Sequence, residues 1–315
     1  MPSWRWLLTI TKVSPMDNFV LILAYLIIGV LLRRLPAMPQ SSGIALNMYV
    51  LYVALPALIL KNVPQLQFSA ELLIPAVTPW FLLLVVVATV LLLSKWLNWP
   101  REITGALLIV LPLGNTSFLG FPMTAALFGD AAMPYAVVYD QIGSFIALAS
   151  YVTIIAALYS PTAAKPTFKG IAVKIITFPS FIALALGLLL RGYDYPPIIT
   201  QLIDNLAATL VPVVMVAVGF ALTIKFSKSE VVPLLSALGI KLLMMPLLAA
   251  ALWLTLGYSG VAVNISIFQA AMPPMISAGA IAIMAGLAPR LVSGIIGLGI
   301  LLGLLTLPVV SWLLH

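Results

Sequence analysis

The feature that most constrains this chain is a succession of long apolar stretches separated by short polar connections. Hydrophobic residues make up 63% of the 315 residues and charged residues only 7%, against roughly 25% charged residues in a soluble domain. A globular core of this length cannot hide so much apolar surface, so the solvent around the chain is lipid. Because lipid offers no partner to free backbone groups, and because the apolar stretches are continuous rather than alternating, the sequence predicts an all-α integral membrane protein.

Ten stretches have the length of about 20 residues that a helix needs to cross a bilayer. We therefore predict ten transmembrane helices, at about residues 18–34, 43–61, 70–95, 102–129, 132–159, 171–191, 199–224, 230–256, 261–287 and 290–314.

The positions of Lys and Arg predict how these helices are oriented. With the N-terminus outside, ten basic residues fall in cytoplasmic loops, and Lys241 lies within a helix. The outer side then holds only Arg5, Lys12, Lys61 and Arg191. Since cytoplasmic loops carry the excess of basic residues, we predict both termini on the non-cytoplasmic side.

Several functional classes are excluded by what the chain contains. The net charge of +7 comes from dispersed basic residues that form no stripe, so we expect no nucleic-acid partner. The chain has no cysteine, and its one histidine, His315, is the last residue. It contains no HExxH or GxSG motif and no second membrane aspartate to pair with Asp140, whereas acid–base chemistry needs paired groups. We therefore predict that the protein is not an enzyme and has no metal site or cofactor, apart from a coupling proton or sodium ion.

The two halves of the chain repeat weakly with an offset near 158 residues. Gly129, at the end of the predicted fourth helix, aligns with Gly286 at the end of the ninth, and an ELLIP segment aligns with an EVVP segment. Five helices per half means that the second copy enters the membrane from the opposite side. The sequence therefore predicts an inverted repeat, 1–160 and 161–315, as in many secondary transporters.

The fourth helix of each half contains helix breakers in its middle. The fourth helix contains LPLGNTSFLGFP at 111–122, and the ninth contains QAAMPPMISAG at 269–279. Proline removes a helix hydrogen bond, and unwound backbone at membrane depth is tolerated where it is buried in protein or lines a cavity. A broken helix also offers the free N–H groups and positive partial charge of its second half to an anion. Alternatively, these residues only kink packed helices.

We predict a substrate site at these breaks. Its candidate residues flank the breaks or are polar residues of the second helix: Gly114, Asn115, Thr116, Gln269, Met272, Pro273, Pro274, Ser277, Asn47 and Tyr52. For Asn47 and Tyr52, hydrogen bonding between neighbouring helices is the simpler alternative.

Ionisable residues inside a membrane span are costly, and they are usually functional. Asp140 is the one carboxylate well inside a predicted span, and Gln141 follows it. We interpret this pair as a coupling site that titrates with a proton or holds sodium. The alternatives are a wet position near the outer helix end and a structural hydrogen-bond acceptor. Lys241 is expected to reach the cytoplasmic interface with its long side chain, and pairing with a carboxylate or the substrate is the alternative.

The segments GNTSFLGFPMTAALFGDAAMPYAVVYDQIG (114–143) and QAAMPPMISAGAIA (269–282) resemble the auxin efflux carrier family, which includes bacterial malate and malonate permeases and is related in fold to bile acid:sodium symporters. The resemblance implies that helices 4 and 9 cross at Asn115 and Pro273. It implies a mobile transport domain of helices 3–5 and 8–10, and a scaffold of helices 1, 2, 6 and 7 through which a homodimer forms. The connection between helices 5 and 6 is short, so the chain looks like a bacterial member, located in the bacterial inner membrane.

We therefore predict a secondary active transporter that moves a small organic anion, a mono- or dicarboxylate, across the lipid membrane by an elevator-type alternating-access mechanism. The alternatives are a passive channel or facilitator for a small solute and, less favoured, an intramembrane enzyme.

Overall fold

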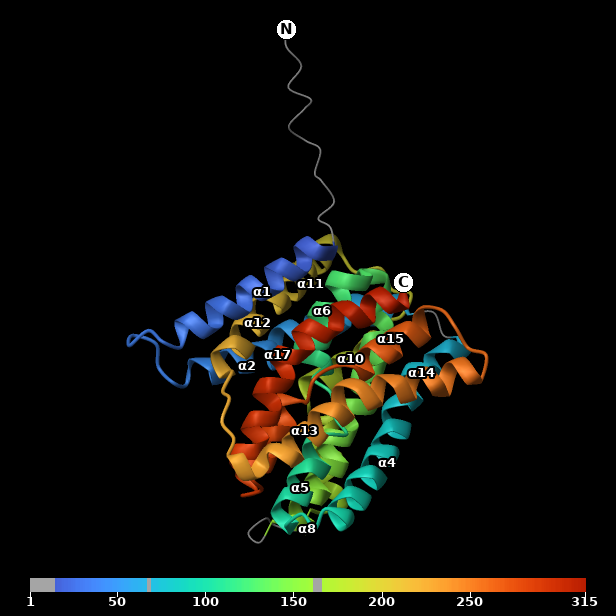
Figure 1. Cartoon of the computed structure of the whole chain (residues 1–315). Helices are drawn as coiled ribbons and strands as arrows, with labels where there is room; N and C mark the ends of the chain where they lie inside the picture. The colour runs from blue at the N-terminus through green and yellow to red at the C-terminus, as the bar shows by residue number, and fades with distance from the viewer. Residues whose placement is uncertain (1–14, 67–68, 161–165) are drawn as a thin grey trace.

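The computed structural model describes residues 15–66, 69–160 and 166–315, and the regular secondary structure within these ranges is helical (Figure 1). Its one β-bridge joins Gly114 and Pro274. Three basic residues of the orientation argument, Arg5, Lys12 and Lys165, lie outside the described residues.

Six helices of the described chain are long and apolar enough to cross a membrane. Several of them join α-helical segments with 3-10 or π-helical turns. They are Ser42–Asn62 (α2 Ser42–Tyr49, η2 Val50–Ala54, α3 Leu55–Asn62), Ala70–Trp96 (η4 Ala70–Leu72, α4 Leu73–Trp96), Asp130–Tyr159 (η6 Asp130–Ala132, α7 Met133–Val138, η7 Tyr139–Phe145, η8 Leu148–Val152, α8 Thr153–Tyr159), Pro197–Ala221 (α11 Pro197–Ala208, α12 Leu210–Ala221), Lys228–Thr255 (η9 Lys228–Glu230, α13 Val231–Gly239, η10 Ile240–Met244, α14 Met245–Thr255) and α17 Pro289–Leu314.

The predicted sixth helix is a bent pair, α9 (Phe168–Ile176) and α10 (Pro179–Leu189), whose axes differ by 62°. Pro179 begins α10, and a proline disfavours helical geometry in the residue before it, which accounts for the bend. Counted as one span, this pair makes seven apolar spans in the described chain.

The other three predicted spans do not appear as long helices. The first is the 18-residue helix α1 (Pro15–Leu32). The fourth is divided into α5 (Arg101–Val110) and a second piece formed by η5 (Thr116–Gly120) and α6 (Phe121–Phe128). The ninth is divided into α15 (Val261–Ala270) and α16 (Ile276–Met284). The predicted breaks are therefore real interruptions, and by length and composition the described part of the chain has six or seven spanning helices.

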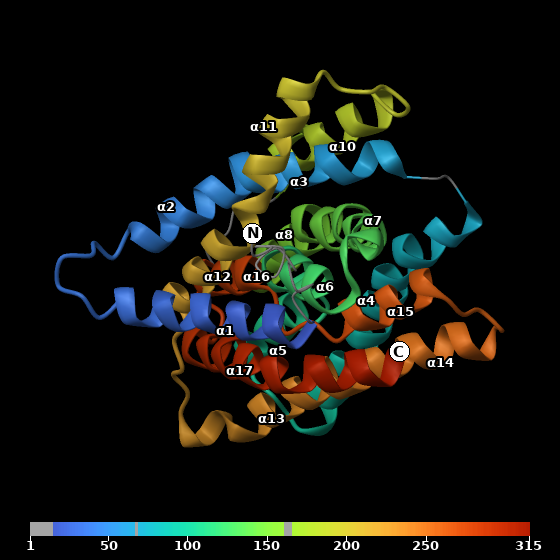
Figure 2. The same ribbon diagram turned by 90° about the horizontal axis from the view of Figure 1, so that it is seen from above.

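The helices pack around two apolar cores. One core is built mainly from α4, α5, α8 and the helices from α13 to α17. The other is built from α1, α2, η2, α3, α6, α7, α10 and α12, together with residues of α15 and α17. In Figure 2, α2, α3, α10 and α11 lie together on one side of the molecule, with α4, α13 and α14 on the other.

Small residues allow the closest helix contacts. A Cβ atom on Gly29 of α1 would lie 2.1 Å from the carbonyl oxygen of Val216, and one on Gly219 of α12 would lie 2.1 Å from that of Leu26. The two helices therefore touch backbone to backbone (Figures 1 and 2). Lipid gives helices little hydrophobic reason to associate, and such close van der Waals packing supplies the attraction instead.

Candidate functional site

The two broken helices meet at their breaks, and we call this meeting point the crossing. Proline at 112, 273 and 274 cannot donate a backbone hydrogen bond, so the chain leaves the helix after Val110 and again after Ala270. The extended pieces then bond to each other. The Asn115 amide donates to the carbonyl oxygen of Pro273 at 2.7 Å, and the Met275 amide donates to that of Leu113 at 3.1 Å. Each break thus satisfies backbone groups that the other break releases, as burial in a membrane requires.

In each of the two broken helices, a new helical segment begins directly after the crossing. The π-helical turn η5 begins at Thr116, with Asn115 as its N-cap, and α16 begins at Ile276. The first N–H groups of a helix have no partner within it, and they give this end a positive partial charge. Two such ends meet at the crossing, where they favour a negatively charged group.

Asp140 lies beside the crossing, 1% exposed, on the π-helical turn η7. Its Oδ1 accepts hydrogen bonds from the hydroxyls of Thr116 and Ser117, and its Oδ2 accepts one from Gln141 Nε2 at 2.7 Å. Asp140 is therefore buried, and it does not occupy the water-exposed position near the outer helix end that was one of the alternatives from the sequence. Single π-helical turns inside helices often mark functional sites.

Neighbours on α4 hold this π-helical turn. Trp80 Nε1 donates to the Ile142 carbonyl oxygen at 3.2 Å. A Cβ atom on Gly143 would lie 2.0 Å from Pro79 Cγ, so only glycine allows η7 to lie this close to α4. The π-helical turn and its carboxylate are thereby fixed against α4.

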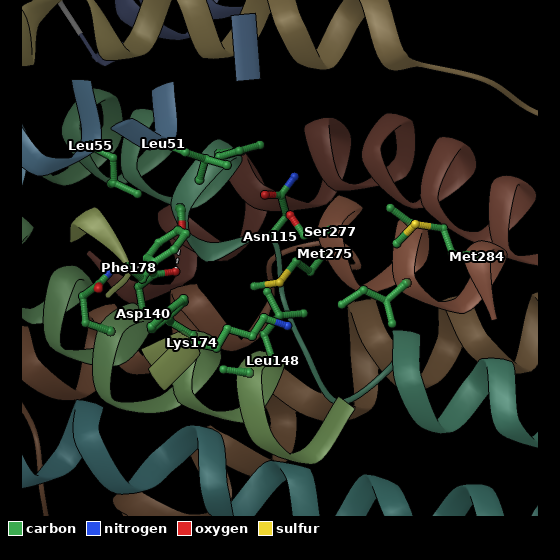
Figure 3. Close-up of a pocket in the computed structure, with 17 residues that line it drawn as sticks. Leu51, Leu55, Asn115, Asp140, Leu148, Lys174, Phe178, Met275, Ser277 and Met284 are labelled. Carbon is green, nitrogen blue, oxygen red and sulfur yellow. Dashed lines mark hydrogen bonds between the residues drawn. The ribbon is translucent and has the colours of Figure 1, made fainter. Parts of the chain in front are cut away.

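A cavity of about 320 Å³ borders the crossing (Figure 3). Its polar lining residues are Asn115, Ser117, Asp140, Gln141, Lys174 and Ser277. The apolar walls come from η2 and α3, from η5, from the segments around η7 and η8, from the α9–α10 bend, and from α16 with the residue before it: Leu51, Leu55, Phe118, Phe145, Leu148, Ala149, Phe178, Met275, Ala280, Ile281 and Met284.

Two amides that line this cavity carry buried atoms without a hydrogen-bond partner among the residues that the structure describes. They are Asn115 Nδ2 and Gln141 Oε1, and their residues are 2% and 1% exposed. Buried polar atoms without partners are rare in native proteins and call for an explanation. Because the two atoms belong to the wall of one cavity, an occupant of the cavity is the natural partner.

The predicted site residues fall into three groups. Asn115, Ser277, Asp140 and Gln141 line the cavity. The second group lies at the crossing without lining the cavity: Gly114, Thr116, Met272, Pro273 and Pro274.

Gln269 and the two residues of the second helix form the third group. Gln269 is buried, and its Nε2 donates to Thr124 at 3.2 Å while its Oε1 has no partner. Asn47 is half-buried and Tyr52 is 55% exposed, and neither lines the cavity. The helix that contains them contributes Leu51 and Leu55 to the cavity wall instead.

Lys241 does not reach the interface, and that expectation is wrong. Its side chain is 0% exposed. Its Nζ lies 3.2 Å from Met245 Sδ and 3.4 Å from where a Cβ on Gly114 would be. The π-helical turn η10 turns Lys241 toward the protein interior rather than along the helix toward water.

Two of the residues that line the cavity were not predicted from the sequence. Ser117 follows Thr116 in the GNTS segment, and its proximity to Asp140 appears only after folding. Lys174 was grouped with the cytoplasmic loops, although it lies inside the apolar helix α9. Pro179 marks the bend that brings α9 to the cavity, and it was the sequence signal that could have found Lys174.

A helical protein with several apolar helices long enough to cross a membrane, and with two broken helices that meet beside a cavity with six polar lining residues, is a polytopic membrane protein of transporter type. The comparison with known families agrees. The chain belongs to the membrane transport protein family, which matches residues 16–311, and this confirms the resemblance to the auxin efflux carriers.

Two archaeal relatives carry transporter names. An "Uncharacterized transporter" of Methanothermobacter thermautotrophicus is 26% identical over 305 residues, which cover 94% of this chain and 97% of the relative. "Uncharacterized transporter MJ1031" of Methanocaldococcus jannaschii is 27% identical over 270 residues, which cover 82% of this chain and 85% of the relative. Both similarities extend over most of the chain, and membership of a transport family is consistent with a protein that is not an enzyme.

Proposed function

We propose that this protein is a secondary active transporter for a small organic anion and that its substrate binds in the cavity at the crossing. The observation that carries the proposal is the unpartnered Asn115 Nδ2 in the wall of that cavity. This amide is a hydrogen-bond donor beside the N-terminal ends of η5 and α16. A carboxylate accepts hydrogen bonds and is favoured by both helix ends, so it is the chemical group that fits.

The charges around the cavity also support an anion. Lys174 lines the cavity and forms no ion pair with a described residue. Asp140 opposes an anion when it is ionised, but three donors surround its two oxygens. The cavity volume of about 320 Å³ suits a mono- or dicarboxylate of small size.

Ten membrane passes in two inverted halves are part of the same proposal. The seven apolar spans, the short helix α1 and the two broken helices together make ten passes. Gly29 and Gly187 stand 158 residues apart, which is the offset of the predicted repeat. Both lie at close helix crossings: Gly29 against α12, and Gly187 against Val63 at the end of α3. Equivalent packing at equivalent positions is what a duplicated fold produces.

The position of the cavity supports an elevator-type motion. One wall belongs to the predicted scaffold helices, through Leu51, Leu55, Lys174 and Phe178, and the other belongs to the predicted transport domain, through the crossing and η7. A substrate held by the crossing can move with one set of helices past the other. Dimerisation through the scaffold and coupling to a proton at Asp140 complete the proposal, with sodium as the alternative ion.

The test is uptake of labelled malonate, malate, succinate and indole-3-acetate into proteoliposomes, with proton and sodium gradients varied separately. We expect saturable uptake of at least one acid and a loss of at least tenfold in Asn115→Ala, because one donor to a buried carboxylate is worth roughly 1.5–3 kcal/mol. Asn205→Ala is the matched control, because Asn205 is exposed on α11 and does not line the cavity.

Uptake that is equal in Asn115→Ala and in the wild type would remove the crossing as the binding site. No uptake of any acid under any gradient would contradict the organic-anion assignment.

A further inference from the structure

The hydrogen bonds of Asp140 determine how the Gln141 amide is turned. Thr116 and Ser117 both donate to Oδ1, so Oδ2 is the oxygen left for Gln141. An ionised carboxylate can only accept hydrogen bonds. Gln141 must therefore turn its NH₂ group toward Asp140, and its Oε1 is then the buried atom without a partner.

We propose that Gln141 is a hydrogen-bond relay that reports the protonation of Asp140 to the cavity. A proton that binds to Asp140 attaches to Oδ2, because Oδ1 already accepts two hydroxyl groups. The new O–H donates, so the Gln141 amide turns over, accepts this bond with Oε1 and leaves its NH₂ group free. The amide end without a protein partner thus changes from an acceptor to a donor.

This turn of the Gln141 amide couples proton binding at Asp140 to anion binding in the same cavity. With Asp140 ionised, the cavity wall contains a negative charge and an unpaired acceptor, and both oppose a carboxylate. With Asp140 protonated, the charge is gone and an NH₂ group joins Asn115 Nδ2 as a donor. The inference rests on the proposed anion transport for this consequence, and it specifies the coupling as symport of one proton with the anion.

Few other charged groups are placed to take this role. Among the described residues that line the cavity, Asp140 is the only carboxylate and Lys174 the only cation. The elements that pack against η7 contribute Tyr135 of α7, Tyr151 of η8 and Lys95 near the end of α4. Lys241 lies behind the crossing, close to Gly114. None of these groups shares a hydrogen bond with Gln141 in the described structure.

The first test needs no substrate. Infrared difference spectra of the purified protein between high and low pH are compared for the wild type, Asp140→Asn and Gln141→Leu. The carboxylic acid C=O band that disappears in Asp140→Asn belongs to Asp140. We expect this band to move to higher frequency in Gln141→Leu, because the Asp140 O–H loses its acceptor. A band with the same frequency in Gln141→Leu and in the wild type would overturn the relay.

The second test measures malonate binding as a function of pH. We expect wild-type affinity to rise as pH falls, by up to about tenfold per pH unit for one linked proton. Asp140→Asn imitates the protonated state, because its Nδ2 can donate to Gln141 Oε1. This variant should bind malonate at pH 8 as tightly as the wild type does at low pH, and with no pH dependence. Loss of binding in Asp140→Asn, or an unchanged pH slope, would overturn the proposal.

Two further comparisons separate the relay from other roles. Ser150→Ala is the matched control on the same span, because Ser150 bonds only to the Ile146 carbonyl of its own helix and does not line the cavity, and it should behave as the wild type in both tests. Malonate affinity that depends on sodium instead of pH would contradict proton coupling. Absence of malonate binding in every variant would contradict the anion assignment, while the infrared comparison would still decide the relay.

Discussion

At the scale of single residues, three of the six polar side chains that line the cavity are buried: Asn115, Asp140 and Gln141. Asn115 and Gln141 each keep one atom unpaired, and Asp140 is held by three side-chain donors. A buried polar atom without a partner costs about 1–3 kcal/mol. Without an occupant, two atoms in the wall of one cavity have this unfavourable free energy. This is expected where a bound molecule supplies the missing hydrogen bonds.

Lys174 provides a test of anion binding from the opposite wall. Replacing it by Gln keeps a long polar side chain but removes the positive charge from the cavity. Because Lys174 is exposed, water screens its charge, and an exposed ion pair is worth roughly 0.2–1 kcal/mol. We therefore expect KM for the transported acid to rise about 1.5- to 5-fold while the maximal rate changes little, as measured by uptake kinetics in proteoliposomes.

Lys169→Gln is the control for this change. Lys169 is an exposed lysine on the same helix α9, and it does not line the cavity. An equal rise of KM in both variants would indicate a general surface-charge effect and would contradict a role of Lys174 in the cavity.

At the scale of the elements, the sequence identified the interruptions and missed the π-helical turns. Proline and glycine in LPLGNTSFLGFP and QAAMPPMISAG predict breaks because they remove backbone donors and relax the chain, and both breaks are present. The π-helical turn η7 around Asp140 contains Gly143 but no proline. This turn depends on contacts with Trp80 and Pro79, about 60 residues away in the chain, and residues so distant leave no local signal.

Trp80→Phe tests whether α4 holds the π-helical turn η7. The change keeps an aromatic ring but removes the Nε1 donor to the Ile142 carbonyl oxygen. A hydrogen bond of this kind contributes about 0.5–1.5 kcal/mol to stability, so we expect a lower melting temperature in detergent and reduced transport. The control is Trp96→Phe at the exposed end of the same helix, where a change within about 0.5 kcal/mol is expected. Equal melting temperatures for the two variants would show that the bond does not stabilise η7.

At the scale of the whole molecule, composition and apolar length were enough to predict a helical membrane protein, and the family comparison agrees. The placement of Lys241 was not predictable, because the sequence does not say which face of a helix turns toward the crossing. The bend between α9 and α10, which brings Lys174 to the cavity, has a local marker in Pro179 that the sequence prediction did not use. The ten passes, the inverted halves and the orientation of the termini stay predictions.

Labelling of introduced cysteines tests the orientation, and the natural absence of cysteine makes the experiment clean. Ser259 lies in the exposed turn between α14 and α15, and Ser41 lies in the exposed turn before α2. With both termini outside, a membrane-impermeant maleimide should label Ser259→Cys in intact cells and Ser41→Cys only after permeabilisation. The reverse pattern would invert the predicted orientation, and labelling of both sites in intact cells would contradict an odd number of spans between them.

The central claim is that the crossing carries a substrate between two alternating states rather than opening a pore. The most direct measurement is counterflow: proteoliposomes loaded with an unlabelled acid that the protein accepts are diluted into a trace of the same acid with label, without any ion gradient. A carrier changes between its two states faster with substrate bound than without it. We therefore predict transient accumulation of label above its equilibrium level, and we expect this accumulation to be absent in Asn115→Ala. Label that only equilibrates, at a rate independent of the acid inside, would contradict the carrier mechanism and indicate a channel.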